Sequence, residues 1–449
     1  MKRLIDTHLL NWKHSKQRKP LLLRGARQVG KTFVVRKLGE SFKNYVEVNF
    51  EQRPELKTIF ETNLVPERMV RDLVSILKQD IIPGETLLFF DEIQQVPKAI
   101  IALRYFYEEM PHLHVIAAGS LLDFAIEKVG IPVGRVTFLY MYPLSWLEFL
   151  MALKNDKLIE NLFNHKGDTP LGAPLHEHTL NLLSEYLVVG GMPEAVRSWV
   201  EEKNALECTR IHHNILDSYR QDFSKYAKEH QVKYLELLFE YALKQLGSKF
   251  KFSKIPGEYR KRELLPAFDL LSTAGVLHKI YHSSGQGIPL GAEVNLDIFK
   301  TIFVDVGLTQ TLLGVEASDW FLSPNESYIN KGYLLEAFVG QELLAYSNPE
   351  SKSNLYYWQK EEKSGQAEID YLIQKERQIV PIEVKSAKGS QLKSLRHFLE
   401  THTKSKYGIR FSSHDFSIFD GVHSYPLYAI FIALGFGFPE KPQTIKNDN

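Results

Sequence analysis

"LLLRGARQVGKTF", residues 21–33, is the stretch of this sequence that decides the fold of its first part. Its three leading leucines form a short apolar run, which predicts a buried strand of a parallel sheet. Residues 25–32 then read G-x-x-x-x-G-K-T, and the residues after them have the spacing of a helix. Because this motif binds phosphate where it connects a strand to a helix, its flanks argue against a chance match in a glycine-containing turn.

The residue types of this motif suit the binding of a nucleotide. Glycines allow the backbone to wrap around phosphate groups, while the loop amides and the helix N-terminus attract anions. We expect Lys31 to neutralise the β- and γ-phosphates of ATP, and the Thr32 hydroxyl to ligate Mg²⁺. The residues expected to bind the nucleotide are Gly25, Ala26, Arg27, Gln28, Val29, Gly30, Lys31 and Thr32.

An acidic pair follows a second apolar run, "TLLFFDEIQ" at residues 86–94. Since the carboxyl ends of parallel strands meet at one edge of a sheet, we expect Asp91 and Glu92 beside the phosphate loop. Asp91 would hold Mg²⁺, and Glu92 would polarise the attacking water. This arrangement favours a hydrolase over a protein that only binds a nucleotide.

Two further polar residues are candidates for the same site. The apolar run "HLHVIAAGS" ends at Ser120, which would face the γ-phosphate, although an ordinary turn at a strand end is the alternative. Arg135 precedes the next apolar segment and would stabilise the transition state in its own chain or, in a homo-oligomer, in a neighbouring subunit. A surface salt bridge is the alternative for Arg135.

These motifs together resemble a known family. "LLLRGARQVGKTF", "LLFFDEIQ", "VIAAGSLL" and "GRVTFLYMYPLSWLEFL" resemble the AAA-type P-loop ATPases of bacteria and archaea in which a C-terminal region of unknown function follows the ATPase domain. The resemblance is specific over residues 1–150 and looser beyond them, where "YLVVGGMPEAV" at 186–196 matches a GGxPE segment typical of the family. It implies ATP binding and hydrolysis, and it implies no particular pathway.

Residues 151–325 are predicted to form a helical region that contains a winged helix at about 232–283. A winged helix would offer basic side chains to DNA phosphates or to the major groove. The alternatives are a protein contact and a basic, solvated face. The basic residues around the expected recognition helix are Lys249, Lys251, Lys254, Arg260, Lys261 and Arg262.

Residues 326–420 show the pattern strand, strand, strand, helix, strand after a leading helix. Asp370 and the E-x-K sequence of Glu383 and Lys385 resemble the core of restriction-endonuclease-like nucleases, with Glu336 on the leading helix. The resemblance implies that Asp370 and Glu383 ligate Mg²⁺ and that Lys385 activates water. The alternatives are an exposed Glu-Lys pair and a fold that persists only as a binding module.

The bulk composition narrows the classes of function. With 55 basic and 54 acidic side chains the net charge is +1, so any DNA contact must come from a local patch. The single cysteine, Cys208, excludes an intramolecular disulfide framework and a cysteine-rich zinc site. Without a signal-peptide core or an apolar stretch of membrane-spanning length, we expect a cytoplasmic protein with no membrane contact.

The predicted fold class is α/β. A P-loop ATPase domain with a parallel sheet occupies 1–150, the helical and winged-helix region 151–325, a restriction-endonuclease-like α/β domain 326–420, and a C-terminal segment with a polar tail 421–449. We expect an ATP-hydrolysing protein whose nucleotide state controls a DNA-binding or nuclease-like C-terminal region. The alternative is a nucleotide-gated protein-interaction switch with an inactive nuclease-like docking domain.

Overall fold

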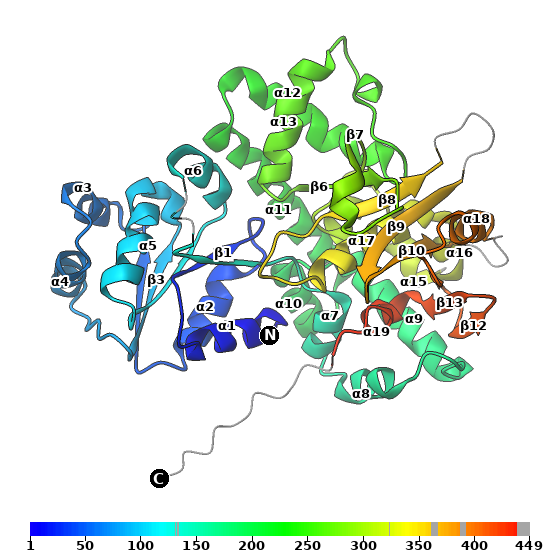
Figure 1. The fold of residues 1–449 in the computed structure, drawn as a ribbon, viewed down its shortest axis with the longest axis horizontal. Helices are drawn as coiled ribbons and strands as arrows, with labels where there is room; N and C mark the ends of the chain where they lie inside the picture. Colours follow the sequence, from blue (N-terminus) through cyan, green and yellow to red (C-terminus); the bar gives the residue numbers. More distant parts are fainter. Residues whose placement is uncertain (131, 133, 323, 361–366, 387–391, 438–449) are drawn as a thin grey trace. The chain divides into compact units, whose positions relative to one another are not determined.

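The computed structural model describes residues 1–437 except 131, 133, 323, 361–366 and 387–391 (Figure 1). The chain divides into two compact units. Of the described residues, the N-terminal unit holds 2–142 together with the short segment 348–352, and the C-terminal unit holds 143–347 and 353–437. The polar tail expected at 438–449 lies outside the described residues.

A five-stranded parallel sheet forms the centre of the N-terminal unit, in the order β2-β3-β4-β1-β5. This result confirms the parallel sheet that the sequence predicted. Every residue of β3 is buried, as the continuous apolar run before Asp91 requires. The strands are β1 (Leu21–Arg24), β2 (Asn44–Asn49), β3 (Thr86–Asp91), β4 (His114–Ala118) and β5 (Thr137–Tyr140).

Helices pack around this sheet, with a core rich in phenylalanine. Phe60 meets the rings of Phe50 and Phe90 edge-on, at centroid distances of 5.5 and 5.6 Å, the geometry that aromatic pairs prefer. The packing holds β2 and β3 in register, and so fixes the edge at which both strands end. The helices are α1 (Ile5–His14), α2 (Lys31–Gly39), α3 (Ile59–Thr62), α4 (Pro66–Leu77), α5 (Pro97–Glu109) and α6 (Leu122–Val129).

The C-terminal unit begins with helices, as predicted for the middle of the chain. The GGxPE segment connects the helix that ends at Val189 to the helix that begins at Pro193, and its two glycines allow close backbone approaches. The Gly191 amide donates a 2.6 Å hydrogen bond to the buried Asp305 carboxylate, and a Cβ on Gly190 would lie 2.2 Å from the same carboxylate. The helices are α7 (Trp146–Ala152), α8 (Asp156–Asn164), α9 (Ala173–Val189), α10 (Pro193–Glu202), α11 (Ala205–Tyr226), α12 (Glu229–Tyr241), α13 (Lys261–Thr273), α14 (Val306–Leu313), α15 (Ala317–Leu322), α16 (Pro324–Asn330), α17 (Gly332–Ala345), α18 (Lys393–Thr401) and α19 (Ile430–Ala433).

A mixed eight-stranded sheet completes the C-terminal unit, in the order β12-β13-β11-β10-β9-β8-β6-β7. Strands β9 and β10 pair antiparallel, whereas β10 and β11 pair parallel. The strands are β6 (Leu277–Ser283), β7 (Val294–Phe303), β8 (Leu355–Gln359), β9 (Glu368–Lys375), β10 (Gln378–Val384), β11 (Gly408–Ser412), β12 (Ser417–Phe419) and β13 (Val422–Pro426).

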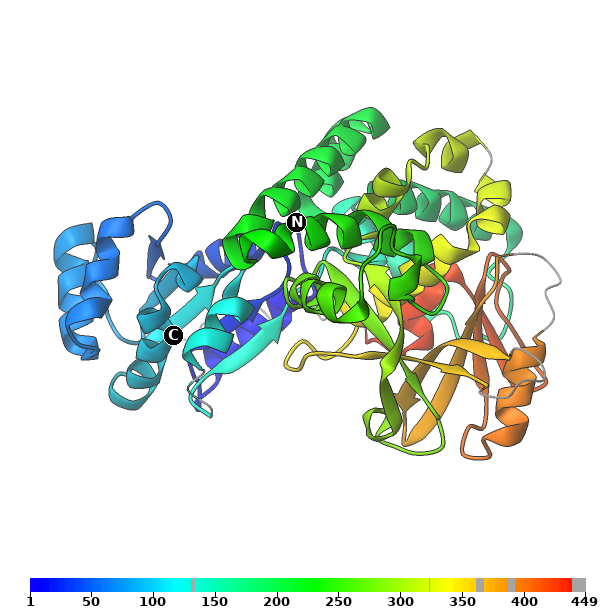
Figure 2. The same cartoon turned by 90° about the horizontal axis from the view of Figure 1, so that it is seen from above.

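This sheet crosses the domain boundary expected near residue 325. Strand β6, which matches the strand expected at the end of the winged helix, forms a hairpin with β7 and also pairs parallel with β8 (Figure 2). The hairpin therefore extends a larger sheet, because pairing with β8 satisfies backbone groups that a free wing would leave at an edge. No described helix combines the length and the apolar character that a membrane span requires.

Candidate functional site

The phosphate-loop motif lies where the sequence placed it, between the end of β1 and the start of α2. Gly25 has φ +143°, and a Cβ there would lie 2.1 Å from the Met141 carbonyl oxygen. Gly30 has φ +95° and directly precedes α2. Side chains would be strained at both positions, so the glycines allow the tight loop that leads into the helix N-terminus.

Lys31 lies inside this loop with its side chain buried. Its ammonium donates hydrogen bonds of 2.8 and 2.7 Å to the carbonyl oxygens of Gly25 and Ala26. Burial lowers the pKa of Lys31 to about 8, although the carboxylates of Glu92 and Asp91 act in the opposite direction. A buried ammonium that has lost its contact with water is strongly stabilised by an anionic ligand. Neutralising the phosphates is the role predicted for Lys31.

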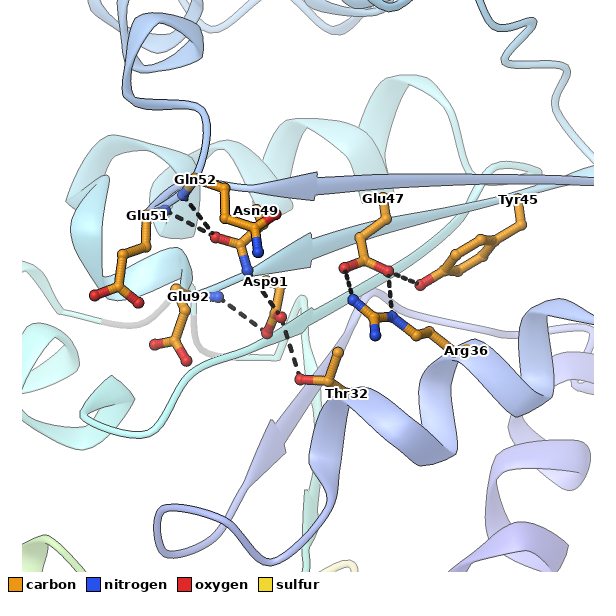
Figure 3. A network of polar contacts seen from close by, with 9 residues as sticks. All are labelled: Thr32, Arg36, Tyr45, Glu47, Asn49, Glu51, Gln52, Asp91 and Glu92. Atoms are coloured by element: carbon orange, nitrogen blue, oxygen red, sulfur yellow. Dashed lines mark hydrogen bonds and ion pairs between the residues drawn. The ribbon is translucent and has the colours of Figure 1, made fainter. Parts of the chain in front are cut away.

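Thr32 and Asp91 meet at the same edge of the sheet (Figure 3). The Thr32 hydroxyl donates a 3.1 Å hydrogen bond to Asp91 Oδ2, which also accepts one of 3.2 Å from Asn49 Nδ2. Burial raises the pKa of Asp91 to about 6, and Glu92 adds to this effect. A hydroxyl and a desolvated carboxylate are oxygen ligands that suit Mg²⁺, with phosphate oxygens and water completing its shell.

Glu92 follows Asp91 in the left-handed backbone region, with φ +51°. Its carboxylate accepts a short hydrogen bond from the Gln94 side-chain amide. Gln94 in turn packs against the end of β4, since a Cβ on Gly119 would lie 1.8 Å from Gln94 Oε1. The side chain of Gln94 therefore connects Glu92 to the strand end that carries Ser120.

Ser120 lies at the same edge as the phosphate loop, because β4 pairs with β1 on one side and with β3 on the other. Asn49 and Gln94 are site residues that the sequence analysis did not single out. Asn49 had a usable signal, since it is a polar residue at the carboxyl end of the run "YVEVN". No sequence signal marked Gln94, because its position depends on how the ends of β3 and β4 pack together.

Arg135 lies at the opposite edge of the sheet. It precedes the first residue of β5, and its Nε lies 3.2 Å from Oε1 of Glu108 near the end of α5. The Arg135 side chain is 46% exposed. Because β1 and β5 run parallel, the amino end of β5 and the phosphate loop are on opposite sides of the strands. Within its own chain, Arg135 makes the surface salt bridge that was its alternative interpretation.

Arg24 is an arginine that lies at the phosphate-loop edge. It ends β1, donates a 2.6 Å hydrogen bond to the Tyr140 hydroxyl, and forms an ion pair with Asp123. Only 12% of its side chain is exposed. Arg24 thereby fixes the start of the phosphate loop to the end of β5 and to α6.

The second group of predicted residues converges in the C-terminal unit. Glu336 on α17, Asp370 on β9 and Glu383 on β10 lie close together. Besides burial, the negative charge of Glu336 acts to raise the pKa of both Asp370 and Glu383. Glu383 pairs with Lys385, as the E-x-K spacing suggested. The backbone amide of Val384 donates a 2.7 Å hydrogen bond to Asp370 Oδ2, which links β9 to the end of β10.

Lys300, from β7, enters this acidic cluster, although the sequence analysis did not identify it. Its Nζ lies 2.8 Å from Glu336 Oε1 and 3.9 Å from Asp370 Oδ1, and it contacts the Glu368 carboxylate. The Lys300 side chain is 1% exposed. Burial acts to lower the pKa of Lys300, but Glu336, Asp370 and Glu368 outweigh burial and raise it.

The chain has three regions that match known sequence families. Residues 17–150 match the AAA domain family, residues 180–319 a domain of unknown function (DUF8612), and residues 331–430 a second one (DUF4143). The curated proteins include no match to this chain.

Two solved structures are among those similar to the chain. A Walker-type ATPase of Pyrococcus abyssi is 15% identical, over 69% of this chain and 94% of that one, with a TM-score of 0.44. The Aeropyrum pernix Orc1 protein in complex with DNA is 14% identical, over 72% of this chain and 94% of that one, with a TM-score of 0.32. At TM-scores this low, neither similarity supports a statement about function.

Proposed function

Because this chain carries an AAA-type P-loop ATPase domain at 17–150, followed by two domains of unknown function, we propose that it binds ATP with Mg²⁺ and hydrolyses it. One observation carries this proposal. Lys31, Thr32 and Asp91 converge at the carboxyl edge of the parallel sheet, with the Thr32–Asp91 hydrogen bond joining the two motifs. Nucleotides bind at this edge in open α/β sheets.

Each residue has a distinct role in the proposed reaction. Lys31 neutralises the β- and γ-phosphates, while Thr32 and Asp91 hold Mg²⁺. Bound Mg²⁺ supplies further neutralisation of the phosphate charge. Glu92 orients the attacking water and accepts its proton, and Gln94 positions Glu92 for this role. Ser120, which follows β4 at the same edge, would face the γ-phosphate.

Steady-state release of phosphate from ATP tests this function. The wild-type chain should turn over ATP in the presence of Mg²⁺, and Lys31→Ala should reduce kcat/KM by roughly 100-fold or more. Lys43→Ala is the matched control, because Lys43 is exposed, precedes β2 at the other edge of the sheet, and pairs with Glu85 at 2.8 Å. Equal activity of the wild type and Lys31→Ala would refute the assignment.

For the C-terminal unit, the sequence predicts two alternative functions: nucleotide-controlled binding or cleavage of DNA, and a nucleotide-gated interaction switch. The grouping of Glu336, Asp370, Glu383 and Lys385 is what supports a nuclease-like site. The buried Lys300 ammonium in the same cluster favours the switch. We therefore favour an ATPase whose C-terminal unit binds a partner without cutting it.

DNA is one partner that this unit would bind, through the basic residues around α13. Lys254, Arg260 and Arg262 are exposed there, while Lys261 is paired with Asp297 at 2.7 Å. Binding of duplex DNA should weaken steeply with salt, and a triple alanine variant of the three exposed residues should lower affinity for all sequences alike. If the wild type does not bind DNA even at low salt, a protein is the partner to test.

A further inference from the structure

The acidic cluster of the C-terminal unit already contains a cation. The Lys300 ammonium lies between carboxylates from two other elements, Glu336 of α17 and the Glu368 and Asp370 pair of β9. Its side chain is buried, with 1% of its surface exposed. It therefore occupies the space toward which these three carboxylates converge.

A divalent metal bound in the same place does not fit these residues. Mg²⁺ requires carboxylate oxygens at about 2.0–2.1 Å in a near-octahedral shell, and the ammonium already contacts Oε1 of both Glu336 and Glu368. An ammonium and a metal ion held by the same carboxylates would also repel each other strongly. Among the described residues, no group of three or more His, Cys, Asp or Glu side chains is arranged to hold a metal.

Among the remaining charges, Glu383 is paired through one oxygen, while its other oxygen, the buried Oε2, has no hydrogen-bond partner. Glu383 Oε1 contacts the Lys385 ammonium, so the cluster combines four carboxylates with two lysines. Asp370 Oδ2 accepts a 2.7 Å hydrogen bond from the Val384 amide.

We propose that the Lys300 ammonium is a built-in counter-ion that replaces the divalent metal of a nuclease-like centre, so that the C-terminal acidic cluster is structural and does not cleave nucleic acid. Lys300 belongs to the region matched by DUF8612, whereas its partner carboxylates belong to the region matched by DUF4143. The counter-ion therefore comes from the sequence segment that precedes the nuclease-like part of the chain, and β7 and α17 are joined by a buried ion pair.

Binding of Mn²⁺ to the full-length chain without nucleotide tests this proposal. Asp91→Asn is placed in every variant, so that the phosphate loop does not contribute a site. Calorimetric titration should detect no binding to this background chain up to about 1 mM Mn²⁺, and Lys300→Met should create a site at least about 10-fold tighter. Adding Asp370→Asn to Lys300→Met should abolish the new site.

Lys279→Met is the matched control, because Lys279 lies on the neighbouring strand β6 and pairs with Asp269 at 2.7 Å outside the cluster. It should gain no Mn²⁺ site. If Lys300→Met does not fold, the titration of the Asp91→Asn chain tests the proposal. Binding of Mn²⁺ to that chain that is lost on adding Asp370→Asn overturns the proposal, and a chain that binds no Mn²⁺ supports it. A folded Lys300→Met chain without a new site also overturns it. The outcome is independent of whether the chain hydrolyses ATP.

Discussion

Thr32 and Asp91 are 59 residues apart in the sequence and are joined by a 3.1 Å hydrogen bond from the Thr32 hydroxyl to Asp91 Oδ2. This bond connects the first turn of α2 to the last residue of β3, where the P-loop and the acidic motif meet. It stabilises the ionised form of a carboxylate that burial otherwise destabilises. The ionisation of Asp91 should therefore determine how kcat/KM for MgATP depends on pH.

The value of kcat/KM for MgATP should fall as the pH drops through about 6, because Asp91 has a pKa of about 6 in the free protein and must be ionised to hold Mg²⁺. Thr32→Val removes a hydrogen bond that lowers this pKa, so it should move the acid limb to higher pH. Thr32→Ser keeps the hydroxyl and should leave the limb in place. An acid limb near pH 4 in the wild type would contradict the role of Asp91.

Gln94→Ala should lower kcat by about 10-fold while MgATP binds as before, because a poorly positioned Glu92 affects the reaction and leaves the ground state unchanged. Gly119→Ala provides a second approach to the same contact. Its new methyl group would overlap the Gln94 side chain, so it should reproduce the kcat defect. A change in MgATP affinity with kcat unaltered would show that Gln94 does not act through Glu92.

Arg135→Ala should leave ATP turnover within about twofold of the wild type in dilute solution, because the side chain faces solvent at the edge opposite the phosphate loop. Turnover should be measured over a range of protein concentrations. A loss of more than about tenfold that appears only at concentrations where the chain self-associates would instead show that Arg135 acts on a neighbouring subunit.

Glu342→Gln should flatten the pH dependence of stability in the C-terminal unit. The Glu342 carboxyl is buried beside the Trp146 amide, at 3.0 and 3.1 Å, and burial raises its pKa to about 8. The folded state then holds a proton that the unfolded state releases above pH 4.5. Its contribution to stability is complete below pH 4.5 and is lost as the pH rises through about 8.

Thermal melts between pH 5 and pH 9 measure this effect. The free energy of unfolding of the wild type should decrease by up to about 1.4 kcal/mol per pH unit as the pH rises from 5 toward 8, and it should level off above the folded pKa of about 8. Glu342→Gln cannot ionise and should lack this decrease, whereas Glu160→Gln, a change at an exposed position of α8, should retain it. Parallel curves for the wild type and Glu342→Gln would contradict the assignment.

Local sequence predicted the P-loop edge well, because the strand, the glycines and the acidic pair each lie in one continuous segment. The edge occupied by Arg135 was also predictable, since a residue before a parallel strand lies at the amino end of the sheet. Lys300 was not predictable. The run "IFKTIF" predicts only a strand. The first carboxylate along the sequence that accepts a hydrogen bond from the Lys300 ammonium belongs to Glu336, which is 36 residues away on a helix.

The extent of the C-terminal sheet was not predictable either. The pairing of β6 with β8 joins segments that a local pattern assigns to separate domains. Strand propensity shows that a segment fits a pleated, half-buried surface, and it does not identify the neighbouring strand. The order of strands therefore depends on packing between distant parts of the chain, which the sequence of one protein does not reveal.

The most direct test of the central claim, that this chain is an ATP hydrolase, is the comparison of MgATP binding and turnover in Glu92→Gln. The substitution keeps the size of a side chain beside Asp91 and Gln94 but removes the carboxylate that accepts the proton of water. We predict equilibrium binding of MgATP equal to that of the wild type, with turnover reduced by about 100-fold or more. Turnover equal to that of the wild type would contradict hydrolysis by Glu92.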